Sequence, residues 1–285
     1  RGLLAGVLLV LVLAACGGSD SPTATPSPYV PPGPAWSEAA PLRSAAASSR
    51  KRVGTAVFSS GIASDPVYAG AAARHFDDLT AEWEMKWDPI ETTRGALDFS
   101  GGDAIVRFAE ANAMSVKGHA LVWHQAVPAW VGALAAPELR TAFEDHIRDV
   151  AGHYLGRVRA WDVVNEAIDD NSYGLRDTVF LRGLGADYIA EAFRLAREAD
   201  PQAELIYNDY NAEGMGGKSD AVYALVKGLK QRGVPIGGVG LQMHISAAGF
   251  PPVAEIAANL RRLGALGLKV NISEMDVRIS ALPGD

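Results

Sequence analysis

Two short strand-like segments of this sequence each end in a glutamate. Residues 160–164 are followed by Asn165 and Glu166, and residues 268–273 are followed by Glu274. Apolar, β-prone runs of this length are typical of strands covered on both faces, and parallel α/β barrels carry their chemistry at the carboxyl ends of such strands. Because two carboxyl groups flanking one bond are the usual means of cleaving a glycosidic bond, we expect that chemistry from Glu166 and Glu274.

Strand-like and helix-like segments alternate along the chain from residue 53 onward. The expected strands are residues 53–58, 79–82, 115–123, 158–165, 204–208, 238–244 and 268–273, and the main expected helices are residues 65–76, 103–112, 137–154, 187–199, 219–232 and 253–266. This alternation predicts parallel βαβ units. The predicted fold class is therefore α/β, a (β/α)8 TIM barrel truncated after strand seven, and because the sequence begins with Arg1 we expect truncation at both ends.

The composition is that of a globular protein that can bury a sizeable core. Of 285 residues, 48% are hydrophobic and 21% are charged, and the formal net charge is −7. An acidic balance argues against binding nucleic acid or an anionic membrane surface through the folded part, and it fits a neutral substrate. The single cysteine, Cys16, excludes an internal disulfide framework.

The first fifty residues predict export and tethering. Residues 1–15 have the apolar core of a signal peptide, and the segment 13–17, Leu-Ala-Ala-Cys-Gly, resembles the lipobox of bacterial lipoproteins, in which the cysteine is lipidated after cleavage. An ordinary secretory signal is the alternative. Residues 16–50 are rich in Ser, Pro and Ala and are expected to form a linker, which leaves residues 51–285 for the barrel. The expected location is extracellular, with membrane contact only through a lipid on Cys16.

Polar and aromatic side chains gather where the predicted strands end. Five segments carry most of them: Thr80–Trp87, His119–His124, Trp161–Glu166, Gly240–His244 and Ile272–Asp276. In this order they resemble the motifs of family 10 glycoside hydrolases, the endo-β-1,4-xylanases, over about residues 53–279. The resemblance implies a retaining endo-β-1,4-xylanase that acts on xylan by double displacement, with no cofactor, no metal and a monomeric state.

The resemblance also assigns roles to individual residues. Glu166 would be the general acid/base and Glu274 the nucleophile, which in a retaining mechanism lie about 5–5.5 Å apart. Asn165 would hold the sugar 2-hydroxyl, and Lys86, His119 and Trp123 would bind the sugar next to the cleaved bond. We expect Gln242 and His244 to bond the nucleophile and keep it ionised. Asp276 either orients His244 or only caps its strand, Trp87 packs below the site, and His124 is structural.

Two positions depart from the family pattern. The family usually has Asn where this chain has Trp83, and Gln where it has Ala126. Both positions serve the second sugar subsite on the glycone side, and each hydroxyl left unpaired in a buried subsite would cost about 1–3 kcal/mol. The hypothesis is that this subsite binds xylose more weakly or takes a different sugar.

The sequence also allows three other functions to be considered beside the xylanase. One is a related β-glycanase with another backbone preference, and another is a non-hydrolytic surface lipoprotein that binds glycan. Intact Glu166 and Glu274 argue against the second of these. A metal-dependent barrel hydrolase would need a His-x-His pair near the first strand, where the sequence has none, since His75 on a predicted helix is the only histidine before residue 119.

Overall fold

Seven parallel strands form one sheet in which every strand pairs with its neighbour in the sequence. The computed structural model describes residues 40–279. The strands are β1 (Gly54–Val57), β2 (Asp78–Ala81), β3 (Ser115–Trp123), β4 (Ala160–Asn165), β5 (Glu204–Asp209), β6 (Gly238–Leu241) and β8 (Lys269–Ile272), and they lie in that order across the sheet. Within the described residues β1 and β8 have no strand partner on their outer edges. The sheet thus contains seven strands of a (β/α)8 barrel, as predicted.

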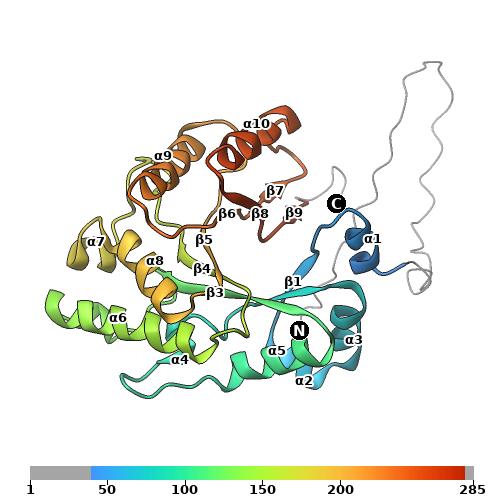
Figure 1. Cartoon of the computed structure of the whole chain (residues 1–285), viewed down its shortest axis with the longest axis horizontal. Helices are drawn as coiled ribbons and strands as arrows, with labels where there is room; N and C mark the ends of the chain where they lie inside the picture. Colours follow the sequence, from blue (N-terminus) through green and yellow to red (C-terminus); the bar gives the residue numbers. More distant parts are fainter. Residues whose placement is uncertain (1–39, 280–285) are drawn as a thin grey trace. The chain divides into compact units, whose positions relative to one another are not determined.

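Helices cover the outer side of the sheet, which forms an arc in Figure 1. They are α1 (Leu42–Ser48), α2 (Ser59–Ser64), α3 (Pro66–His75), α4 (Trp87–Ile90), α5 (Ser100–Ala111), α6 (Ala136–His153), α7 (Val179–Leu184), α8 (Tyr188–Ala199), α9 (Gly217–Gln231) and α10 (Val253–Gly264), with a 3-10 turn at Val131–Ala133. Asp65 begins α3 as predicted, because its carboxylate accepts the amides of Val67 and Tyr68 at 2.8 and 3.0 Å. The short helices α2, α4 and α7 were not predicted.

The core lies between the sheet and these helices. All six residues of β4 are buried, and four of them are apolar, as expected of a strand covered on both faces. Trp161, Phe143, Phe193 and Tyr207 are among the fully buried side chains. Trp87 is also buried, and it stacks on His146 with ring centroids 4.0 Å apart, so it packs beneath the strand ends as expected.

The predicted strand 238–244 is in fact two strands. β6 ends at Leu241, and Met243 has the left-handed backbone angle φ 65°, with its amide bound to the buried Glu213 carboxylate at 2.9 Å. This break starts a separate strand, β7 (His244–Ser246), which pairs in parallel with β9 (Asp276–Arg278). The register places His244 directly beside Asp276.

The folded region begins earlier than the predicted linker end at residue 50. Helix α1 lies inside the range assigned to the linker, and the Arg43 guanidinium donates to the carbonyl oxygens of Ala73, Asn112 and Ala113 at 3.0–3.3 Å. The predicted signal peptide, Cys16 and the linker up to residue 39 lie outside the described residues. Among residues 40–279, no helix combines the length and apolar character needed to cross a bilayer.

Candidate functional site

Glu166 lies at the end of β4, and its carboxyl group contacts its neighbour Asn165 and side chains from two other segments. Its carboxylate accepts the Trp123 indole N–H at 2.9 Å on Oε2 and the Gln242 amide at 3.1 Å on Oε1. The Asn165 amide approaches the same Oε1 at 3.4 Å. Glu166 is only 6% exposed, and its backbone is left-handed with φ 58°, a conformation that is uncommon for a residue with a side chain. The chain therefore turns sharply at the residue that presents the carboxyl group.

Glu274 follows β8 and binds a different set of groups. Its Oε1 accepts the Asn208 amide at 2.6 Å, and its Oε2 lies 3.3 Å from Nε2 of His244. Burial opposes ionisation of Glu274, but the hydrogen bond from His244 and the nearby His119 outweigh it, so the pKa of Glu274 lies below its ordinary value. This carboxyl group is therefore ionised over a wider pH range than a free glutamate.

His244 is held between two carboxylates. Its Nδ1 lies 2.7 Å from Asp276 Oδ2, while Nε2 faces Glu274. The hydrogen bond to Glu274 raises the pKa of His244 to about 9, against partial burial, and Asp276 adds to the increase. Of the two possibilities left open for Asp276, the geometry favours orienting His244, because the β7–β9 pairing sets the two residues side by side.

A buried cluster of charged side chains reaches Glu274 through His119. The Asp162 carboxylate of β4 contacts the Lys117 ammonium at 2.6 Å and His119 Nδ1 at 2.8 Å, and the same His119 nitrogen is 4.0 Å from Glu274. Burial raises the cost of charging Asp162, yet the neighbouring Lys117 and His119 hold its pKa below the usual value. Asp162 thereby anchors the imidazole that faces Glu274.

His119, Asp162 and Glu274 also offer three possible ligand atoms within 4.8 Å of one another. They suit a metal ion poorly. Both Lys117 and His119 already contact the Oδ2 atom of Asp162, so a cation there would meet the fixed positive charge of Lys117. We therefore infer that this cluster holds the His119 imidazole beside Glu274.

Lys86 lies beside the indole rings of Trp83 and Trp123. Its ammonium is 4.7 Å from the Trp123 ring centroid and 5.2 Å from that of Trp83, and it donates to the Glu82 carbonyl at 2.6 Å. Burial lowers the pKa of Lys86, against the attraction of nearby carboxylates that include Glu274 and Glu166. Trp83 is 40% exposed, so its ring can contact a ligand, whereas Ala126 is buried.

The structure brings all eight predicted site residues together, with one correction. Gln242 was expected to bond Glu274, but its side chain binds Glu166 and Asn165, and Asn208 binds Glu274 instead. The reason is barrel geometry, in which inward side chains of alternate strands share a layer. Gln242 follows β6 and reaches β4 across β5, whereas Asn208 on β5 reaches past β6 to the end of β8. The Asn208 amide also lies 3.0 Å from Asn165 and so links the two carboxyl groups.

Sequence reasoning missed Asn208 as a site residue, together with Asp162 and Lys117. A signal existed for the last two. Each is a charged residue inside a run that predicts a fully covered strand, and such residues are buried only when they are paired. Asn208 ends the expected strand 204–208, but neither its residue type nor its spacing distinguishes it from other polar residues at strand ends.

A parallel barrel sheet with two supported carboxyl groups at its carboxyl edge defines the class of glycoside-cleaving enzymes. The chain belongs to glycosyl hydrolase family 10, whose family model matches residues 41–283.

Known proteins similar to this chain agree with that assignment. The endo-1,4-beta-xylanase B of Thermotoga neapolitana is 44% identical over 211 residues, which cover 73% of this chain and 60% of that protein. The exoglucanase XynX of Acetivibrio thermocellus is 38% identical over 242 residues, 80% of this chain and 22% of that protein. The crystal structure of xylanase 10B from Thermotoga petrophila RKU-1 in complex with xylobiose superposes with a TM-score of 0.82 at 41% identity, covering 86% of this chain and 76% of the other. The chain thus spans less than two thirds of the length of the curated relatives it matches.

Proposed function

We propose that this chain is a retaining endo-β-1,4-xylanase that hydrolyses internal bonds of xylan. The observation that carries the proposal is that the two carboxyl groups have different hydrogen-bond partners. Glu274 accepts from Asn208 at 2.6 Å, faces a His244 whose pKa is about 9, and has a lowered pKa of its own, as a nucleophile requires. Among the described residues, the side chains that donate hydrogen bonds to the Glu166 carboxyl group are the uncharged Trp123, Gln242 and Asn165, as suits a residue that holds and releases a proton.

The proposed reaction has two steps. Glu274 attacks the anomeric carbon while Glu166 gives its proton to the glycosidic oxygen, so the C–O bond breaks and a glycosyl ester forms on Glu274. The Glu166 carboxylate then takes a proton from water, whose oxygen attacks the same carbon and releases Glu274. Asn165 is placed to bind the sugar 2-hydroxyl, and Lys86, His119 and Trp123 to bind the sugar ring.

Sugar release from soluble xylan tests this function directly. Wild-type chain should release reducing ends, Glu274→Ala should release none, and Glu166→Ala should be about 10²–10⁴-fold slower. Proton NMR of the first product should show the β-anomer before mutarotation. Equal activity of wild type and Glu274→Ala would overturn the assignment, and binding of xylan in an affinity gel without any hydrolysis would favour the glycan-binding lipoprotein.

A related β-glycanase with an altered glycone subsite is the second candidate. It is favoured by the exposed Trp83 indole beside Lys86, at a position where Asn is usual, and by the buried Ala126 where Gln is usual. A ring face in place of an amide would exchange hydrogen bonding for stacking. Comparing kcat/KM on xylo-oligosaccharides and cello-oligosaccharides of equal length separates the two candidates.

We also propose that residues 1–15 are a lipoprotein signal peptide and that Cys16 is lipidated, which would place the enzyme outside the cell on a lipid anchor. The support is the position of the single cysteine directly after Leu13-Ala14-Ala15. Expression in a bacterial host followed by detergent phase partition tests the proposal. The wild-type chain should enter the detergent phase and Cys16→Ser should not; partition of both into water would contradict lipidation.

A further inference from the structure

The three residues that begin with Glu166 leave the sheet, and one arginine binds all three of their carbonyl oxygens. Nε of Arg176 donates to the Glu166 carbonyl at 3.1 Å, and its Nη2 donates to the Ile168 carbonyl at 3.0 Å. The backbone N–H of Arg176 donates to the carbonyl between them, that of Ala167, at 2.7 Å. A planar guanidinium has its donors in fixed directions, so it can bridge two acceptors whose separation it sets.

The amides of the same three residues also have partners. Glu166 N–H donates to the Asn208 carbonyl at 2.9 Å, Ala167 N–H donates to the Tyr207 hydroxyl at 3.1 Å, and Ile168 N–H lies 3.4 Å from Asp209 Oδ2. All six backbone polar groups of residues 166–168 are therefore bound. This is the segment in which Glu166 adopts φ 58°, a conformation that costs free energy and persists only where the surroundings determine it.

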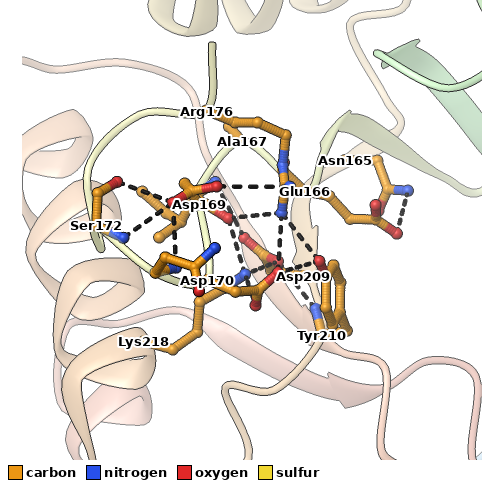
Figure 2. Close-up of polar contacts among 12 residues, drawn as sticks. Asn165, Glu166, Ala167, Asp169, Asp170, Ser172, Arg176, Asp209, Tyr210 and Lys218 are labelled. Atoms are coloured by element: carbon orange, nitrogen blue, oxygen red, sulfur yellow. Dashed lines mark hydrogen bonds and ion pairs between the residues drawn. The ribbon is translucent and has the colours of Figure 1, made fainter. Parts of the chain in front are cut away.

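Arg176 is itself held by the acidic side chain of Asp170 in the same loop and by Tyr210, which follows β5 (Figure 2). Its Nη2 also contacts Asp170 at 3.3 Å and the Tyr210 hydroxyl at 3.0 Å. The Lys218 ammonium of α9 donates to the Ile168 carbonyl at 2.8 Å and pairs with Asp170 at 2.9 Å. Lys218 therefore shares two acceptors with Arg176, the Ile168 carbonyl and the Asp170 carboxylate.

Lys218 extends the network into the core. Its ammonium lies 3.1 Å from Asp209, whose side chain is completely buried while that of Lys218 is 6% exposed. A buried ion pair of this kind is weak support for stability, because removing two charges from water offsets much of their attraction. The pair instead fixes the position of the Ile168 backbone, since Lys218 binds its carbonyl and Asp209 binds its amide.

We propose that Arg176 is a positioning residue that fixes the backbone of residues 166–168 and thereby aims the Glu166 carboxyl group, with Lys218 and Asp209 holding the other end of the same segment. The inference rests on the proposed role of Glu166 as the acid. Arg176 should therefore affect proton transfer from Glu166 to the leaving group and should have little effect on attack by Glu274.

Substrates that differ only in leaving group test this division. Phenyl β-xylobioside needs a proton on its leaving oxygen, whereas 2,4-dinitrophenyl β-xylobioside leaves without one. For Arg176→Gln in the full chain, kcat/KM for the phenyl substrate should fall about 10–100-fold, the size expected when a catalytic group is displaced by about 1 Å. With the dinitrophenyl substrate kcat/KM should change by less than about threefold.

Two further variants separate geometry from charge. Arg176→Lys keeps the positive charge but replaces the planar guanidinium by a single ammonium. Like Arg176→Gln, it should therefore lower kcat/KM for the phenyl substrate far more than for the dinitrophenyl substrate. Arg182→Gln is the matched control, since Arg182 is an exposed arginine on α7 whose ion pair within residues 40–279 is with the exposed Asp177. Recovery of wild-type rates in Arg176→Lys, or equal losses on both substrates in Arg176→Gln, would overturn the proposal.

Hydrogen exchange of the peptide covering residues 160–176 gives a readout that does not depend on hydrolysis. Arg176→Gln should speed exchange of the amides of residues 166–168, while Arg182→Gln leaves them unchanged. Faster exchange in a chain that cleaves neither substrate would refute the proposed function and support the positioning role. Unchanged exchange together with unchanged leaving-group preference in an active enzyme would refute the positioning role alone.

Discussion

Replacing His244 by Gln should raise the pH at which the enzyme loses activity in acid. Protonated His244 lies 3.3 Å from Glu274 and favours its ionised form, so removing that charge must raise the pKa of Glu274. Two unit charges at this separation interact by about 1 kcal/mol in water and about 5 kcal/mol at an effective dielectric constant of about 20. The side chains of His244 and Glu274 are 40% and 27% exposed, so screening places the loss near the lower end, at about 1–2 kcal/mol.

That loss corresponds to about one pH unit, at 1.36 kcal/mol per unit. The assay is kcat/KM for an aryl β-xylobioside from about pH 3 to about pH 8, whose acid limb reports the ionisation of the nucleophile in the free enzyme. Asp276→Asn is the control, because it removes one partner of His244 while leaving the imidazolium charged in acid, so the limb should stay in place. This account of Glu274 would be refuted if the midpoint of the acid limb stayed in place in His244→Gln, or if it moved equally in both variants.

Three further predictions concern specificity and stability. Trp83→Asn combined with Ala126→Gln should raise kcat/KM on xylo-oligosaccharides by about fivefold or more, the equivalent of about 1 kcal/mol from regained hydrogen bonds; unchanged kinetics would dismiss the altered subsite. His146 is buried and its pKa is lowered to about 3, so folding stability should fall as the pH drops below the unfolded value of about 6.5, by about 2 kcal/mol at pH 5. Melting curves of His146→Gln should show a smaller loss of Tm over that range, and an identical loss would place the acid sensitivity elsewhere. Gly118→Ala should cost about 1–3 kcal/mol in urea unfolding, because its Cβ would overlap the buried Trp161 ring, and a neutral result would mean that the ring can move.

The sequence predicted the strands and their carboxyl-end residues well because both follow from local patterns. Apolar residues predominate in β3 and β4, as expected of strands covered on both faces, so the residues at which they end could be identified. Because parallel strands align their carboxyl ends, Glu166 and Glu274 were expected to meet. The short helices α2, α4 and α7 were missed because segments of one or two turns depend on tertiary packing more than on propensity.

The partners of the two carboxyl groups could not be predicted in the same way. Gln242 and Asn208 are both amides at strand ends, and only the curvature of the sheet determines that Gln242 reaches Glu166 while Asn208 reaches Glu274. The contacts of Arg176 likewise depend on a loop whose path is fixed by Lys218, a residue far along the chain. Side-chain contacts across the sheet depend on its curvature and leave no periodic signal in the sequence.

Sequential pairing of the strands has a consequence for how the site assembles during folding. Because each strand of the sheet pairs with its neighbour in the chain, structure can grow from β3 and β4 outward without closing long loops. Glu166 and its arginine would then be in place before β8 docks at the edge and delivers Glu274. Pulsed hydrogen exchange during refolding should find β4 protected before β8, and simultaneous protection would argue against this order. Under that order, a partly folded chain would carry the proton donor without the nucleophile and would be catalytically silent until β8 joined the sheet.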